Sequence, residues 1–149
     1  MVAWIYPKGT SDFPGIAGKV SYGTDSNGYE LGMGWAAAGS GDKVYGTLDD
    51  ASSYQEGVGS TSMSLNTWHH IALTWDGTTM KLYLDGAQDY SGSQTITPTP
   101  ASSTFLVGKA GDWYRIFNGK IDEVRVYNRA LPVGEVSTLY NSGSGCSGP

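Results

Sequence analysis

Two Asp-Gly pairs constrain this chain more than any other feature. Asp76-Gly77 follows the run 68–75 and Asp85-Gly86 follows the run 79–84, and both runs are rich in aromatic and branched residues. Glycine reaches positive φ without a steric clash and aspartate tolerates it, so each pair suits a tight hairpin turn of type I′. Two such turns in succession predict a three-stranded antiparallel meander that ends in residues 87–90.

The first turn also predicts which residues face one another. With Asp76 and Gly77 as the two turn residues, the cross-strand pairs are Trp75 with Thr78, Leu73 with Met80, Ile71 with Leu82 and His69 with Leu84. Side chains alternate across a strand. One face therefore carries Ile71, Leu73, Trp75, Met80, Leu82 and Leu84, and we expect it to be core. The other face is mixed and carries Trp68, His70, Ala72, Thr74, Thr79, Lys81 and Tyr83.

The adjacent histidines, His69 and His70, point to opposite faces in this register. A shared proton relay or a metal site built on both rings would need them on one side. Their adjacency therefore argues against either, and we expect both to be structural or exposed.

A second alternating run covers residues 119–131 and predicts another strand. In it Val124 and Val126 point one way with Asp122, and Ile121, Glu123, Arg125 and Tyr127 point the other way. Pro132 then opens a short stretch with helical spacing, which predicts a helical turn that caps one end of the sheet. Shorter runs bounded by Gly, Pro, Ser or Asp read as further strands, and residues 91–103 read as a surface connection. The pattern indicates an all-β, two-sheet antiparallel jelly-roll sandwich.

Composition excludes several classes of function. The formal net charge is -5 and no run of Lys or Arg occurs, so nucleic acid is not an expected partner. No stretch approaches the ~20 apolar residues that span a bilayer, and no signal peptide is visible. The single cysteine, Cys146, cannot form an internal disulfide or a thiolate-built zinc site.

At these residues the chain resembles the laminin-G-like members of the concanavalin A-like lectin and glucanase superfamily. The matching elements are Trp68 to His70, the Asp76-Gly77 turn, the Tyr83, Asp85, Gly86 ending, the later run Gly119 to Leu131, and the opening Ala3 to Pro7. The resemblance implies a jelly-roll domain over residues 1–141, with a flexible Gly/Ser tail at 142–149. It further implies a non-catalytic module of an extracellular or cell-surface protein.

The resemblance also implies a missing element. Family members carry a strand ahead of the one near Trp4, and this chain starts too late to supply it. An unpaired strand edge invites another backbone. We therefore expect that a second chain, as in a homodimer, or a rearranged terminus covers this edge. The alternative expectation is that the sequence is a fragment of a longer gene product.

An enzyme is not expected. Retaining glycosidases need two carboxyl groups about 5 to 5.5 Å apart, which the glucanase relatives place at alternate positions of one strand. The four glutamates, Glu30, Glu56, Glu123 and Glu135, have no carboxylate two residues away. No Gly-x-Ser-x-Gly elbow occurs either. A glycoside hydrolase is therefore the least favoured reading.

Carbohydrate is the leading ligand class. The connection 111–119 gathers Asp112, Trp113, Tyr114, Arg115 and Asn118. Aromatic rings can stack on the C–H faces of a sugar while polar groups pair its hydroxyls. The competing interpretation, the more common one for loop aromatics, is that Trp113 or Tyr114 folds back as a lid over the core.

Two further candidates stay open. Trp68, His70, Lys81 and Tyr83 on the mixed face could line a groove, although cross-strand aromatic pairs commonly only stabilise a sheet. Asp122 could bind a structural calcium ion, but it more commonly accepts hydrogen bonds from nearby backbone N–H groups. The sequence thus predicts a recognition module for a glycan or glycoprotein. The alternative is an assembly module that pairs with another chain through its sheet edge.

Overall fold

The computed structural model describes residues 1–9, 14–21, 27–35, 40–99, 104–110 and 115–143. Two five-stranded sheets dominate it: sheet A in the order β12-β1-β6-β7-β8 and sheet B in the order β5-β4-β3-β2-β9. Sheet A is built from β1 (Val2–Pro7), β6 (His69–Trp75), β7 (Thr79–Leu84), β8 (Ala87–Ser93) and β12 (Gly119–Arg125). Sheet B is built from β2 (Gly15–Ser21), β3 (Asn27–Trp35), β4 (Ser40–Asp50), β5 (Tyr54–Val58) and β9 (Leu106–Val107).

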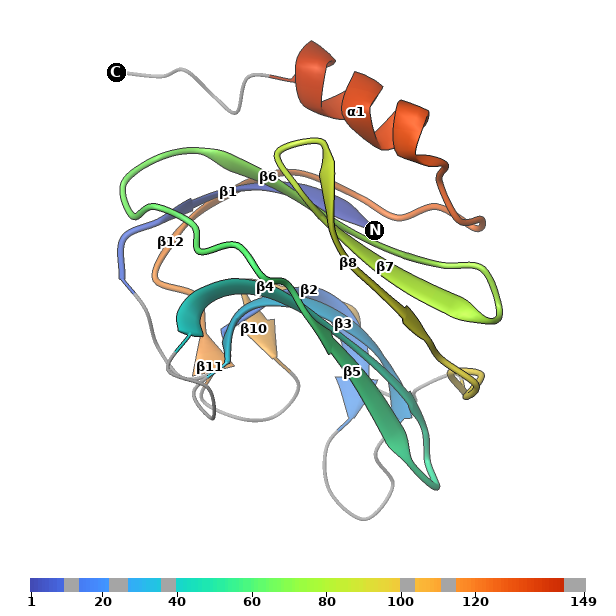
Figure 1. Cartoon of the computed structure of the whole chain (residues 1–149). Coiled ribbons are helices and arrows are strands. Elements are labelled where there is room, and N and C mark those ends of the chain that lie inside the picture. The colour runs from blue at the N-terminus through green and yellow to red at the C-terminus, as the bar shows by residue number, and fades with distance from the viewer. Residues whose placement is uncertain (10–13, 22–26, 36–39, 100–103, 111–114, 144–149) are drawn as a thin grey trace.

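The two sheets lie face to face, as Figure 1 shows, and all their neighbouring strands pair antiparallel. A small hairpin of β10 (Lys109–Ala110) and β11 (Arg115–Ile116) and a helix, α1 (Val133–Ser142), complete the described chain. The sandwich expected from the sequence is confirmed. Within the described residues, no helix is long and apolar enough to cross a membrane.

The meander β6-β7-β8 forms as expected, but one of its two turns differs. Asp85 and Gly86 have φ of 49° and 79° and connect the paired residues Leu84 and Ala87, so this two-residue turn is confirmed. At the other turn the predicted register is wrong, because Trp75 pairs with Met80 and Leu73 with Leu82.

The side chain of Asp76 explains this difference. Its Oδ1 accepts hydrogen bonds from the backbone nitrogens of Thr78 (3.0 Å) and Thr79 (2.8 Å), which stabilises a longer loop. The register therefore shifts by two residues. A shift of two leaves every side chain on its predicted face, whereas a shift of one would have reversed them all.

The core lies between the sheets and uses the predicted apolar face. Ile71, Met80 and Leu82 are fully buried, and they pack with Leu31, Met33 and Val44 of sheet B. The two sheets pack tightly at Gly46, where an added Cβ would lie 2.2 Å from Cδ1 of Leu73. Glycine is required there because a side chain has no room.

The sequence pattern predicted that the helix would cap an end of the sheet, and this prediction is wrong for α1. The helix lies across the side of sheet A that faces away from sheet B, at the top of Figure 1. Val136 is fully buried there and packs with Val2, Ala72 and Tyr83, while Leu131 closes the same cluster. The mixed face of the meander thus becomes a second, smaller core.

Strand β12 departs from simple alternation. Its pairing with β1 runs from Trp4 opposite Asp122 to Val2 opposite Arg125, so β12 holds one extra residue. Glu123, at φ 49°, lies at this bulge. As a result Ile121 and Val124 both pack against the main core, and the prediction that they point to opposite sides is wrong. The strand ends at Arg125, opposite the start of β1, and not at residue 131.

Candidate functional site

The two histidines have separate structural partners. Nδ1 of His69 lies 2.8 Å from Oδ2 of Asp85, and this hydrogen bond raises the pKa of His69. The other oxygen of Asp85 accepts the backbone N–H of His70 at 2.9 Å. The His70 ring packs against Trp4 at 5.4 Å between centroids, and burial lowers its pKa to about 4. The rings point apart, as expected, and His70 is neutral near pH 7.

The second candidate face does not form one open groove. His70 and Tyr83 are each 1% exposed beneath α1. Trp68 instead packs edge-on against Tyr6, with 5.6 Å between ring centroids. The groove reading therefore fails for two of its four residues, because the helix that the sequence placed at the sheet end covers them.

The candidate loop is described only in part, because Asp112, Trp113 and Tyr114 lie outside the described residues. Asn118 is exposed, and its carbonyl accepts the N–H of Lys8 at 2.9 Å beside the end of β1. Arg115 opens β11, and its positive charge partly offsets the rise that burial causes in the pKa of Glu56 on β5. Arg115 therefore interacts electrostatically with a side chain of sheet B.

The side of sheet B that faces away from sheet A, here called the outer face, carries a row of polar side chains. Leu31, Leu48 and an added Cβ at Gly57 all point to the core. The residues between them therefore point outward. Cross-strand pairing places Glu30 on β3, Thr47 on β4 and Glu56 on β5 in one line. Figure 1 shows β10 and β11 on this same, concave side of sheet B.

Glu30 and Tyr45 form the buried centre of the outer face. Both are nearly inaccessible, at 0% and 2% exposure, and the Tyr45 hydroxyl donates a hydrogen bond to Oε1 of Glu30. The Tyr45 ring occupies the space beside Gly32, where an added Cβ would be 2.3 Å from the ring. Buried polar groups on an outer sheet surface are costly unless paired, so this pairing fixes Glu30 in place.

Glu56 is the accessible member of the row. Burial raises its pKa to about 7, the charge of Arg115 lowers it, and the charge of Glu30 raises it further. Its carboxyl group therefore takes up or releases a proton near neutral pH. Carboxyl groups with such shifted pKa values gather at functional sites, although structural networks produce them too.

An exposed aromatic ring borders the same row. Tyr54 lies two residues before Glu56 on β5, so both side chains are on the outer face, and Tyr54 is 63% exposed. Asp49, its cross-strand partner on β4, is buried and accepts the N–H of Ala51 at 3.0 Å. A bare ring next to polar groups can stack on a sugar and pair its hydroxyls.

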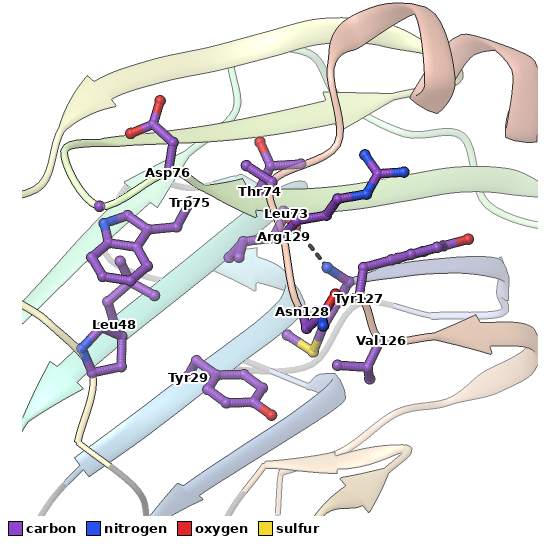
Figure 2. A pocket seen from close by; sticks show the side chains of 14 residues that line it. Tyr29, Leu48, Leu73, Thr74, Trp75, Asp76, Val126, Tyr127, Asn128 and Arg129 are labelled. Carbon is purple, nitrogen blue, oxygen red and sulfur yellow. Dashed lines mark hydrogen bonds between the residues drawn. The ribbon is translucent and has the colours of Figure 1, made fainter.

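A cavity of about 520 Å³ opens at one end of the sandwich, between the sheets and beside the β6–β7 turn. We call it the end cavity. Figure 2 shows Trp75 and Leu48 on one side of it, Val126 and Asn128 on the other, and Tyr29 below. Segment 126–130, which joins β12 to α1, closes one wall.

Asp122 makes the kind of contact that the sequence analysis considered more common. Its Oδ1 accepts the N–H of Glu123 at 2.8 Å, at the bulge in β12. Within the described residues, no three His, Cys, Asp or Glu side chains gather as a metal site. A calcium ion at Asp122 would need ligands from elsewhere, and it stays a prediction.

The row on sheet B was not predicted from the sequence. Glu30, Thr47 and Glu56 come from three strands, and their alignment depends on pairings that the sequence did not specify. A test for carboxylates two residues apart on one strand could not find them. The available sign was Glu30 itself, a lone acid between apolar residues of a strand.

Comparison with known families places the chain. The model of a laminin-G family, described as the concanavalin A-like lectin/glucanases superfamily, matches residues 1–137. The chain therefore belongs to this family. Among curated proteins no match was found.

Solved structures show the same fold at low sequence identity. A protein from Bacteroides ovatus ATCC 8483, named for carbohydrate binding, is 24% identical with a TM-score of 0.74 over 91% of this chain and 38% of its own. Domain 4 of AbnA, an extracellular arabinanase of Geobacillus stearothermophilus, in complex with arabinotriose, is 22% identical with a TM-score of 0.71 over 93% of this chain and 64% of its own. The CBM40 of Ruminococcus gnavus IT-sialidase, bound to sialyllactose, is 16% identical with a TM-score of 0.73 over 93% and 80%. The chain thus spans less than two thirds of the length of the first two.

Proposed function

We propose that this laminin-G-like domain is a non-catalytic carbohydrate-binding module whose site is the outer face of sheet B. The observation that carries the proposal is the half-buried Glu56 beside the exposed ring of Tyr54, with the buried Glu30 and Thr47 behind it in the same row. The structural relatives support the ligand class, because they include domains solved with arabinotriose and sialyllactose.

The proposed mechanism divides the work between a ring and polar groups. Tyr54 stacks on the apolar face of a sugar ring. The Glu56 carboxylate accepts sugar hydroxyls, and Arg115 donates to them. Asp112, Trp113 and Tyr114 belong to the proposal because they directly precede Arg115 in the chain.

The proposal excludes hydrolysis on a geometric ground. Glycoside hydrolysis uses two carboxyl groups that both reach the glycosidic bond. Glu30 is fully buried and bonded to Tyr45, so Glu56 has no accessible partner in its row. We expect no release of dye from chromogenic glycosides, and turnover that Glu56→Gln abolishes would contradict the non-catalytic assignment.

Retardation in polysaccharide gels tests the proposal. The panel contains arabinan, other neutral polysaccharides and a sialylated glycoprotein, and the variants are Tyr54→Ala, Arg115→Ala and Glu56→Gln. We expect at least one polymer to retard the wild type and each variant to lose most of that retardation. Arg125→Ala, an exposed arginine on β12 paired with Glu123, serves as the control and should bind normally. Retardation that all three variants retain would refute the site.

The rival function is assembly through a sheet edge. Strand β12 forms the outer edge of sheet A in the described chain, and a homodimer there stays a prediction. Solution mass separates the two functions: a stable dimer that binds no glycan supports assembly, and a glycan-binding monomer supports the module. The proposed setting is an extracellular or cell-surface protein, with a glycan or glycoprotein as partner.

A further inference from the structure

We propose that the end cavity is a second binding site, separate from the outer face of sheet B, and that it takes one or two units of a neutral sugar. The first observation is its size and position. About 520 Å³ lies within the range of cavities that enclose small ligands. The cavity lies between the sheets, whereas the outer face of sheet B is on the far side of that layer.

The second observation is a buried donor that lacks a hydrogen-bond partner, together with two neutral polar groups in the same lining. The indole Nε1 of Trp75 is buried and has no hydrogen bond in the described structure. The half-buried Tyr29 hydroxyl and the exposed Asn128 side-chain amide line the same cavity and add two neutral hydrogen-bonding groups. Buried donors are normally satisfied, so a ligand oxygen at Trp75 would remove a real deficit.

The lining around these groups is aromatic and aliphatic. Trp75 and Tyr29 supply ring faces, and Leu48 and Val126 complete the walls, as Figure 2 shows. Ring faces with a few polar groups suit the C–H surfaces and hydroxyls of a sugar. A purely apolar ligand would leave the polar groups unpaired.

The charges at the rim favour a neutral ligand over an acidic one. Arg129 lines the cavity, but its guanidinium already pairs with Glu135 at 2.7 Å. Asp76 adds a negative charge on the same rim. The Met1 amino group also lines the cavity, but it donates to the Leu73 carbonyl at 2.8 Å and burial lowers its pKa to about 6. An anionic sugar would therefore meet one neutralised cation, one amino group that is largely uncharged at neutral pH, and one carboxylate.

The end cavity and the outer face of sheet B differ in shape, so they suit different parts of a glycan. The end cavity is enclosed on one side by segment 126–130, so it suits a chain end or a free short saccharide. The outer face of sheet B is open at Tyr54 and suits the interior of a longer chain. Binding at one surface does not require binding at the other.

The test follows the indole N–H resonance of Trp75 by NMR during sugar titration. The chain holds five tryptophans, and Trp75→Phe identifies the signal by its loss. The probes are D-glucose, D-galactose, D-xylose, L-arabinose and their disaccharides. Each is added to a concentration of about 50 mM, a range that reveals millimolar affinity. D-glucuronic acid is the matched acidic probe for D-glucose.

We expect a neutral sugar to shift the Trp75 signal more strongly than its acidic counterpart. The double variant Tyr29→Phe with Asn128→Ala keeps the ring packing, and it should weaken that titration about tenfold by removing two hydrogen-bonding groups. Tyr54→Ala should leave it unchanged, which separates this site from the proposed one on sheet B. No shift with any neutral probe, an equal response to glucuronic acid, or full affinity in the folded double variant would overturn the inference.

Discussion

The same substitution is expected to have a large cost at one Asp-Gly turn and a small cost at the other, although the two sequences match. Asp85 accepts two hydrogen bonds from groups that are nearly buried: the His69 ring at 2.8 Å and the His70 backbone N–H at 2.9 Å. Asp76 accepts its bonds from Thr78 and Thr79 in full contact with water. Replacing each aspartate by alanine should therefore have very different costs.

The magnitude for Asp85→Ala follows from these contacts. Hydrogen bonds to a charged group contribute about 1.5–3 kcal/mol each, and the substitution also leaves the His70 N–H unpaired. Alanine at φ 49° adds strain of roughly 1 kcal/mol. Because 34% of the Asp85 side chain is exposed, solvent reduces the electrostatic part. We expect a loss of about 2–4 kcal/mol in the free energy of unfolding.

Urea unfolding of the two alanine variants measures this difference. Asp76→Ala should cost clearly less than Asp85→Ala, because water replaces the bonds that it removes. Asp85→Asn should fall between wild type and Asp85→Ala, since asparagine tolerates positive φ and retains one acceptor oxygen. Equal losses at the two turns would refute the reasoning.

The His69–Asp85 pair makes the free energy of unfolding depend on pH. The pKa of His69 is raised by its bond to Asp85, so its contribution is present below the ordinary histidine value of 6.5 and is lost as pH rises through the raised pKa. Burial alone would raise the pKa of Asp85, but the bonds from His69 and His70 lower it below 3.8. The stability gap between wild type and Asp85→Asn should therefore be largest between about pH 4 and 6.5.

Further predictions concern Glu56 and two glycines. Burial in the folded state raises the pKa of Glu56 from 4.5 to about 7, so the stability of the wild type should fall as pH rises across this interval. Over the same interval the Tm of Glu56→Gln should fall less than that of the wild type. Parallel Tm curves for the two proteins would contradict this. Gly46→Ala should lower stability by about 1–3 kcal/mol, because its Cβ would lie 2.2 Å from Leu73. Gly134→Ala, where nothing lies within 4 Å, should instead raise stability by roughly 0.5–1 kcal/mol in urea unfolding; the opposite order would contradict the packing.

The sheet faces were predictable from sequence because they depend on a period of two. Ile71 and Leu82 are in the core even though their predicted pairing was wrong, since the register moved by an even number. The same rule failed in β12, where the bulge at Glu123 adds one residue. A bulge leaves no mark in an otherwise regular apolar pattern, so it could not be predicted.

The position of α1 and the pairing of β5 could not be predicted because they depend on contacts between residues far apart in the sequence. A helical stretch was expected at 133–141, but the position of α1 over Ala72 and Tyr83 depends on tertiary packing. Strand β5 was missed because residues 54–58 hold only Tyr54 and Val58 as strand-favouring residues, separated by Gln, Glu and Gly. Without β5, Glu56 could not be aligned with Glu30, and the row on sheet B stayed hidden.

Backbone NMR mapping tests the central claim, carbohydrate recognition by the outer face of sheet B, most directly. The protein is titrated with an oligosaccharide cut from whichever polysaccharide retards it in gels. We predict the largest amide shifts at Thr47 on β4 and in residues 54–57 on β5, and their loss in Tyr54→Ala but not in Leu65→Ala, a variant of another exposed side chain. Shifts confined to sheet A, or unchanged in Tyr54→Ala, would contradict it.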